Sequence, residues 1–129
     1  MDPIADLLTR IRNASSAKHD KVDVPYSAVK EGIVNVLKSR GLVKNFRVVK
    51  DNRQGMMRIY LKYDNEGTPV LTHLKRESRP GLRKYIGVDE IPSVRTGFGV
   101  AVLSTSHGIM SGDEAKEKRF GGEYICSVW

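Results

Sequence analysis

The first apolar residues of the chain recur every three or four positions, which is the spacing of one helix face. They are Ile4, Leu7, Leu8 and Ile11. Asp2 is suited to cap the first turn, and Pro3 loses no hydrogen bond at that position. The pattern therefore predicts a helix whose opposite face, with Arg12 and Asn13, is open to solvent or a ligand.

A second amphipathic helix is predicted after a short extended segment at residues 22–25. Ser27 is a favourable N-cap, and Gly41 is a natural C-terminal stop. We expect the apolar positions between these two residues to form the buried stripe of the helix. They are Val29, Ile33, Val36 and Leu37.

From residue 43 onward the apolar period changes from that of a helix to that of a strand. Residues 43–49 and 57–63 are predicted to form two strands, with a turn at 51–55. In the second strand apolar and polar side chains alternate, as they do when one face of a strand is buried.

The polar run at residues 64–69 contains Gly67 and Pro69 and is the best candidate for a module boundary. Beyond it the pattern predicts mostly strands, at 70–76, 84–88, 100–103 and 124–129, with a turn at 79–81 and a helical turn near 92–96. Ser111 and Glu114 form a capping box for one short helix, about 112–118.

These elements predict an α/β fold of the α+β type with two small modules. The N-terminal module, residues 1–66, has the order α-β-α-β-β. The C-terminal module, residues 67–129, is mostly β with short helices.

Composition narrows the class of protein. Of the 129 residues 40% are hydrophobic, so the chain can bury a core and is not disordered as a whole. The single cysteine, Cys126, excludes an internal disulfide framework and is expected to be a small buried apolar residue. The acidic N-terminus and the lack of a long apolar run predict a cytoplasmic protein without a signal or membrane segment.

The net charge of +7, from 22 basic and 15 acidic residues, favours a polyanionic partner. Nucleic acid fits best, and a membrane surface is disfavoured because neither helix has a strongly basic polar face. Residues 30–62 hold nine basic and two acidic side chains. Charge alone therefore indicates this segment as the binding face.

The sequence has few signs of catalysis or of a cofactor. It lacks a GxxxxGK(S/T) phosphate loop, and Gly97-Phe98-Gly99 is a weak match to a dinucleotide loop. Its histidines, His19, His73 and His107, lack metal-ligand spacing. Ser106 and His107 are adjacent, and we expect their side chains to point apart. The prediction is no enzyme, no metal and no cofactor, with a small serine hydrolase that uses this pair as an alternative.

Two segments have the chemistry of an RNA site. Residues 104–108, Ser-Thr-Ser-His-Gly, place three hydroxyls and a glycine at the end of an apolar strand. Hydroxyls that donate and accept suit bases, riboses and phosphates, although the same residues also form ordinary turns. Around the turn at 79–81, Arg79 and Arg83 suit phosphates and Tyr85 suits stacking on a base. A sheet tyrosine beside a solvated basic edge is the alternative here.

Four ordered segments resemble the eighth small-subunit ribosomal protein family of bacteria. Residues 99–110, GVAVLSTSHGIM, followed by Ala115-Lys116, resemble the signature sequence of the family. Residues 2–13, DPIADLLTRIRN, resemble the N-terminal sequence of its bacterial members. Two further blocks are similar to SRPGLR at 78–83 and to Gly121-Gly122-Glu123. The resemblance covers essentially the whole chain.

The resemblance implies two tightly packed α/β modules and a non-enzymatic, primary rRNA-binding protein of the small ribosomal subunit. Such a protein binds an irregular helix in the central domain of the rRNA, helps to organise the platform and contacts neighbouring ribosomal proteins. The specific rRNA-contacting residues implied are Ser104, Thr105, Ser106, His107, Gly108, Tyr85 and Glu123. Secondary contacts are expected at Asn13, Ser27 and Lys30, and the basic turn adds Arg79 and Arg83.

Charge and resemblance point to different segments. Positioning charges and reading groups are often different residues, so we expect specificity at 104–108 and long-range attraction and secondary rRNA contacts from 30–62. A translational repressor that binds its own operon messenger RNA, alone or in addition, is the main alternative function.

Overall fold

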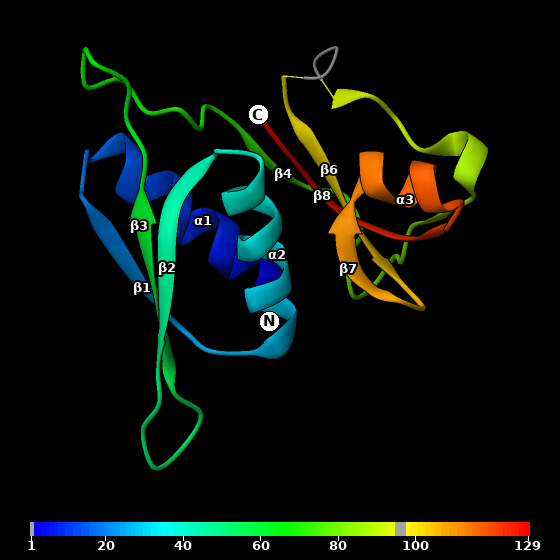
Figure 1. The fold of residues 1–129 in the computed structure, drawn as a ribbon. Helices are drawn as coiled ribbons and strands as arrows, with labels where there is room; N and C mark the ends of the chain where they lie inside the picture. Colours follow the sequence, from blue (N-terminus) through cyan, green and yellow to red (C-terminus); the bar gives the residue numbers. More distant parts are fainter. Residues whose placement is uncertain (1, 95–97) are drawn as a thin grey trace.

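The N-terminal half of the chain forms a three-stranded sheet with two helices on one face (Figure 1). The computed structural model describes residues 2–94 and 98–129. The elements of this half are α1 (Pro3–Ser16), β1 (Lys21–Pro25), α2 (Ala28–Ser39), β2 (Val43–Val49) and β3 (Met56–Leu61). The sheet is antiparallel with the order β1-β3-β2.

The C-terminal half forms a five-stranded antiparallel sheet in which β8 pairs with three strands. Its elements are β4 (Leu74–Arg76), β5 (Tyr85–Ile86), the 3-10 helix η1 (Val88–Glu90), β6 (Val100–Thr105), β7 (Gly108–Ser111), α3 (Gly112–Lys118) and β8 (Gly122–Val128). The order is β4-β8-β6-β7, and β5 pairs with β8. The predicted α+β class is confirmed.

The three predicted N-cap residues are confirmed, whereas the carboxylate of Glu114, predicted to complete a capping box with Ser111, accepts from Lys118 Nζ instead. Asp2, Ser27 and Ser111 each accept a hydrogen bond from a backbone N–H of the first turn of their helix. At the end of α2 the backbone of Gly41 has φ +73°, and its N–H donates to the carbonyl oxygen of Lys38. A glycine adopts this left-handed conformation without strain, so the helix ends there.

One position in the predicted stripe of α2 is wrong. Val29 is 45% exposed, whereas Val34, which the prediction omitted, is fully buried. Lys30 is also buried, and its Nζ donates a 3.0 Å hydrogen bond to the carbonyl oxygen of Pro25. The stripe shifts because α2 is covered both by its own sheet and by β7 of the second sheet.

Two predicted strands are shorter in the structure. Residues 70–73 are not part of a strand, because the N–H groups of Thr72 and His73 both donate to the carbonyl oxygen of Trp129. The strand predicted at 84–88 is reduced to β5, and the chain then turns into η1. Of the helical turn predicted near 92–96, residues 95 and 96 lie outside the described part of the chain.

A single buried cluster of apolar side chains runs through both halves. It includes Leu7, Ile33 and Ile59 from the first half and Val102 and Val128 from the second. The predicted boundary between residues 66 and 67 lies in a surface turn, while the two halves that it separates share one core, and the division into two modules stays a prediction. The strand β8 was expected to alternate, but residues 124–128 are all buried because elements cover both faces of its sheet.

Cys126 lies in this shared core, fully buried, as expected. Burial raises the pKa of its thiol to about 12. The side chain is therefore a neutral, small core residue at physiological pH.

The two halves meet where α2 packs on β7. A Cβ atom on Gly32 would lie 3.0 Å from both Cβ and Cδ1 of Ile109. A residue with a Cβ would need the Ile109 side chain to move by a few tenths of an ångström, so glycine is the best fit where the helix lies this close to the strand. Figure 1 shows α2 between the two sheets.

A buried ion pair fixes the start of α1 to the second sheet. Arg76 Nε donates a 2.9 Å hydrogen bond to Asp2 Oδ2, and Arg76 Nη1 donates to the carbonyl oxygen of Ile125 at 2.8 Å. The two side chains are only 8% and 17% exposed. Burial raises the pKa of Asp2, but the hydrogen bonds from Arg76 and the backbone outweigh it, so the pKa lies below the ordinary value of 3.8.

The glycine before Glu123 yields the first prediction. A Cβ atom on Gly122 would overlap the carbonyl oxygen of Ser104 and lie 3.0 Å from its carbonyl carbon. We expect Gly122→Ala to lower the free energy of unfolding by about 1–3 kcal/mol, because backbone must move. Gly81→Ala is the control, since a Cβ there meets nothing within 4 Å. Equal urea midpoints for the two variants would contradict the close approach of β8 and β6.

The Asp2–Arg76 pair yields a pH-dependent prediction. Because the folded-state pKa of Asp2 is lowered, its stabilisation is present above the ordinary value of 3.8 and is lost as the pH falls through the lowered pKa. Asp2→Asn keeps a cap but leaves Arg76 buried without its carboxylate. We expect it to lower the free energy of unfolding by about 1–3 kcal/mol at pH 7.

Urea unfolding of both proteins over a series of pH values from 7 downward measures this effect. The difference between wild type and Asp2→Asn should shrink as the pH falls through the lowered pKa of the wild-type carboxyl. A difference that stays constant would show that the charge of Asp2 does not stabilise the fold.

Candidate nucleic-acid interface

The hydroxyl-rich segment forms the tip of the β6–β7 hairpin. Thr105 and Gly108 are the last paired residues, so Ser106 and His107 form a two-residue turn. Gly108 has φ +108°, a conformation that favours glycine. This explains why the segment ends in a glycine.

The hydroxyl of Thr105 holds the turn in place. Its Oγ1 donates to the carbonyl oxygen of Gly108 at 2.9 Å and accepts from the N–H of His107 at 3.1 Å. The turn therefore presents Ser106, whose side chain is exposed, from a fixed backbone.

Ser106 and His107 do not point apart as expected. Ser106 Oγ lies 3.1 Å from His107 Nδ1, because the tight turn brings neighbouring side chains to one side. The imidazole stacks on the ring of Phe120, with centroids 4.0 Å apart and planes 3° from parallel. Phe120 follows Arg119, the C-cap residue of α3, which has a left-handed conformation with φ +62°.

This serine–histidine contact lacks the rest of a catalytic constellation. Both residues are exposed, and among the described residues no carboxylate is within hydrogen-bonding distance of His107. A serine nucleophile needs an oriented base and an oxyanion hole. Within residues 2–94 and 98–129 there is also no cluster of three side chains that could hold a metal ion.

The predicted residues Tyr85, Glu123 and Ser104 are brought into one row across three strands. Tyr85 of β5 pairs with Glu123 of β8, and Glu123 pairs with Ser104 of β6. Residues paired in this way point to the same face of a sheet. Tyr85 is 69% exposed at one end of the row, and the hairpin tip continues from the other.

The carboxylate of Glu123 is held by two donors. It accepts from Ser78 Oγ at 2.6 Å and from Arg83 Nη1 at 3.0 Å. Burial by itself would raise the pKa of Glu123. Hydrogen bonds from Ser78 and Arg83 and the positive charges of Arg83 and Arg76 outweigh this effect, so the pKa lies below its ordinary value. The row therefore contains a fixed, ionised acceptor.

Sequence reasoning missed the role of Ser78. This residue is fully buried, and its hydroxyl also accepts from the N–H of Lys84 at 3.0 Å. It thereby joins the turn at 79–82 to Glu123. Its place in the block SRPGLR was visible in the sequence, but its partner is 45 positions away.

Several predicted secondary residues also meet. Ser27, Lys30 and Arg83 line a hollow of about 290 Å³ beside the N-termini of both long helices. Arg83 reaches from this hollow to Glu123, which connects it to the row. The hydroxyl of Ser27 accepts from the N–H of Lys30, and the amine of Lys30 is held by Pro25. Lys30 therefore supports the fold rather than presenting a charge.

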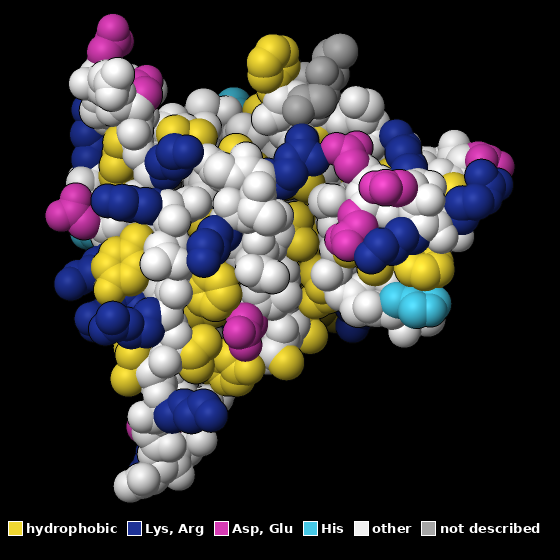
Figure 2. Space-filling model, viewed as in Figure 1, with side chains coloured by type: hydrophobic (Ala, Val, Ile, Leu, Met, Phe, Trp, Pro, Cys, Tyr) yellow, Lys and Arg dark blue, Asp and Glu magenta, His cyan; other side chains and the backbone are white. Residues whose placement is uncertain are grey.

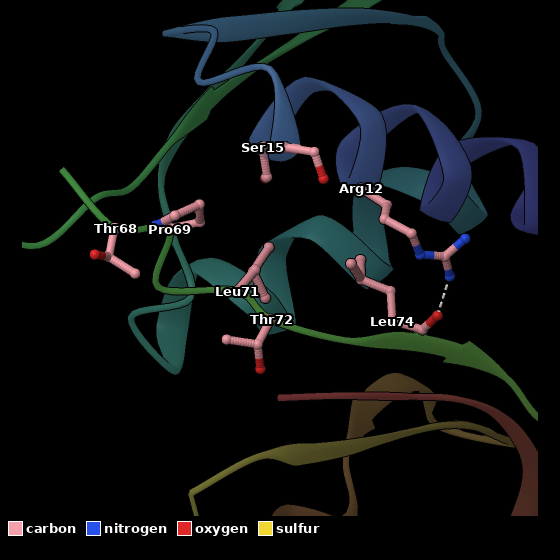
Figure 3. A pocket seen from close by; sticks show the side chains of 8 residues that line it. Arg12, Ser15, Thr68, Pro69, Leu71, Thr72 and Leu74 are labelled. Carbon is pink, nitrogen blue, oxygen red and sulfur yellow. Dashed lines mark hydrogen bonds between the residues drawn. The ribbon is translucent and has the colours of Figure 1, made fainter.

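The other two secondary residues are Asn13, which is on α1, and Arg79, which lies beside it. Arg79 lines a hollow of about 280 Å³ with Thr9 and Arg12. Another hollow, of about 200 Å³, lies between the end of α1 and residues 68–74, where Arg12 donates to the carbonyl oxygen of Leu74 (Figure 3). Asn13 is exposed on α1, about 15 Å along the helix axis from Pro3.

The basic segment 30–62 does not present all of its charges. Arg40 pairs with Asp113, Arg58 pairs with Asp23, and Lys30 is buried. Figure 2 shows Lys and Arg side chains along the left edge of the molecule, where the three-stranded sheet lies. The hydroxyl row and this basic surface belong to different sheets.

Comparisons with known proteins support the resemblance seen in the sequence. The family model described as Ribosomal protein S8 matches residues 2–129. A relative from Geobacter metallireducens, named small ribosomal subunit protein uS8, is 57% identical over 128 residues, which cover 99% of this chain and 97% of the relative. Relatives of the same name from Syntrophotalea carbinolica and Bdellovibrio bacteriovorus are 56% and 50% identical, the latter over the full length of both chains.

No helix in the described part of the chain is long and apolar enough to span a membrane. The matched range includes the hairpin tip, the row at Glu123 and the capped start of α1. Since the family model and relatives above 50% identity match almost every residue, the chain belongs to the ribosomal protein S8 family.

Proposed function

We propose that this chain is a structural constituent of the small ribosomal subunit and binds rRNA through the row Tyr85–Glu123–Ser104 and the adjoining hairpin tip. The names of the relatives support the first part, because they are small-subunit proteins. The alignment of the three residues in one register of the sheet supports the second.

The chemistry of this surface suits an RNA groove. Ser104 and Ser106 offer hydroxyls, Glu123 is a fixed acceptor, and Tyr85 offers an exposed ring. Hydroxyls and a carboxylate can hydrogen-bond ribose 2′-hydroxyls and base edges, and the ring can stack on an unpaired base. Arg83 is paired with Glu123, so the surface selects by shape and hydrogen bonding more than by charge.

The ligand proposed is an irregular helix in the central domain of small-subunit rRNA, and the role is to help assemble the platform beside neighbouring ribosomal proteins. The role is non-catalytic and needs no cofactor. Recognition by shape does not distinguish rRNA from a messenger RNA that folds alike. Repression of the chain's own operon messenger is therefore the alternative role of the same surface.

Titration with two RNAs tests this proposal. The purified chain is titrated with a central-domain rRNA fragment and with an unrelated hairpin of equal length, at two salt concentrations. We expect a preference of about a thousandfold or more for the rRNA fragment. Equal, salt-sensitive affinity for both would show that the net charge of +7 accounts for all binding.

Ser106 yields a site-specific prediction. Ser106→Ala should weaken binding of the rRNA fragment by about 1–2 kcal/mol, roughly 5- to 30-fold, because a hydrogen bond to RNA is lost. Ser93→Ala is the matched control: this exposed serine neighbours Val94, whose carbonyl oxygen accepts from the N–H of Gly99 just before β6, and β6 runs about 17 Å from its first residue to the tip. If both variants bind the fragment as tightly as wild type does, the hairpin tip is not part of the interface.

A further inference from the structure

The outer face of the three-stranded sheet is uncovered and chemically ordered. Both helices lie on the other face, where Val24, Met57 and Ile59 are buried (Figure 1). The outward residues form three rows across β1, β3 and β2. The rows are Lys21–Tyr60–Asn45, Asp23–Arg58–Arg47 and Pro25–Met56–Val49.

The middle row has an excess of positive charge. Arg58 and Arg47 are opposite each other, an arrangement that costs stability because like charges repel. Arg58 donates to both carboxylate oxygens of Asp23, at 2.9 and 3.2 Å, so the only carboxylate in the three rows is already paired with an arginine. Neither Arg47 nor Lys21 forms an ion pair within 4.0 Å among the described residues, and the charge of Lys21 acts only at longer range on the Asp23 carboxylate that Arg58 holds. An incoming anion would relieve the repulsion.

The two flanking rows contain an aromatic side chain and apolar side chains on which nucleic-acid bases can stack. Tyr60 lies between a lysine and an asparagine, in the middle strand. Met56 and Val49 of the third row are 43% and 45% exposed, which is high for large apolar side chains. An aromatic ring with neighbouring cations is the arrangement on which single-stranded nucleic acids stack their bases and place their phosphates.

We propose that this face binds a single-stranded RNA segment, separate from the RNA bound at the hairpin tip. A duplex is disfavoured because its bases are stacked inside and cannot reach Tyr60. The face extends about 20 Å along the six residues of β3, which is room for a few nucleotides. The inference goes beyond the proposed function, since it needs a second RNA segment on the other sheet.

The test asks whether two RNAs bind at once. The full chain is first saturated with the central-domain rRNA fragment and then titrated with a fluorescent uridine oligonucleotide of about twelve nucleotides. We expect the oligonucleotide to bind the free chain and the saturated chain with similar affinity. If the oligonucleotide binds the free chain but not the chain saturated with the fragment, the two RNAs compete for one site. That result would overturn the proposal and leave the proposed function intact. Failure of the fragment alone to bind would count against the proposed function only.

Variants test whether the oligonucleotide binds on the outer face of the three-stranded sheet. Tyr60→Leu should weaken oligonucleotide binding about fivefold or more through lost stacking. Arg47→Gln, an exposed side chain whose loss does not open the core, should weaken it measurably and reduce its salt dependence. Lys116→Gln removes an exposed charge from α3 and is the control for charge alone. Ser106→Ala should weaken binding of the rRNA fragment and leave binding of the oligonucleotide unchanged.

An acidic polypeptide is the competing occupant. Poly-glutamate that displaces the oligonucleotide at equal charge concentration would show an unselective anion surface and overturn the proposal. Equal weakening by Arg47→Gln and Lys116→Gln would do the same. Unchanged affinity of both Tyr60→Leu and Arg47→Gln would place the oligonucleotide elsewhere.

Discussion

The close packing of α2 on β7 positions the rest of the molecule. At Gly32 the helix lies close against Ile109, where a Cβ atom would be 3.0 Å from its side chain, and Ile109 pairs with Ser104 in the hairpin. The N-terminus of α2, with Ser27, therefore lies near the same hollow as Arg83 and the row at Glu123. Behind this contact, buried side chains of both sheets pack into one core, so the two sheets hold each other in place.

The second sheet depends in turn on how closely β8 approaches its neighbours. Backbone atoms of Ile86 and Ser104 occupy the places where side chains of Gly121 and Gly122 would be. The strand can then pair with β5 and β6 at once and align Glu123 between them. The glycine pair thus has a steric reason, and the alignment of the candidate RNA site follows from it.

Charge and specificity are distributed over different surfaces. At the row, Arg83 is neutralised by Glu123, so hydroxyls and shape dominate. On the outer face of the first sheet, Arg47 forms no ion pair among the described residues, and the charge of Lys21 acts on an Asp23 already paired with Arg58, so we propose that this face supplies long-range attraction.

Local patterns were enough to determine the capped helices, the hairpin of β2 and β3, and the family, because caps, periodicity and contiguous motifs depend on near neighbours. They also singled out residues 104–108 and Tyr85. Only the tertiary structure decided that Val29 is exposed and Lys30 buried, that Ser106 and His107 meet, and that Ser78 holds Glu123. Those outcomes depend on elements far apart in the chain, whose packing and register no local pattern contains.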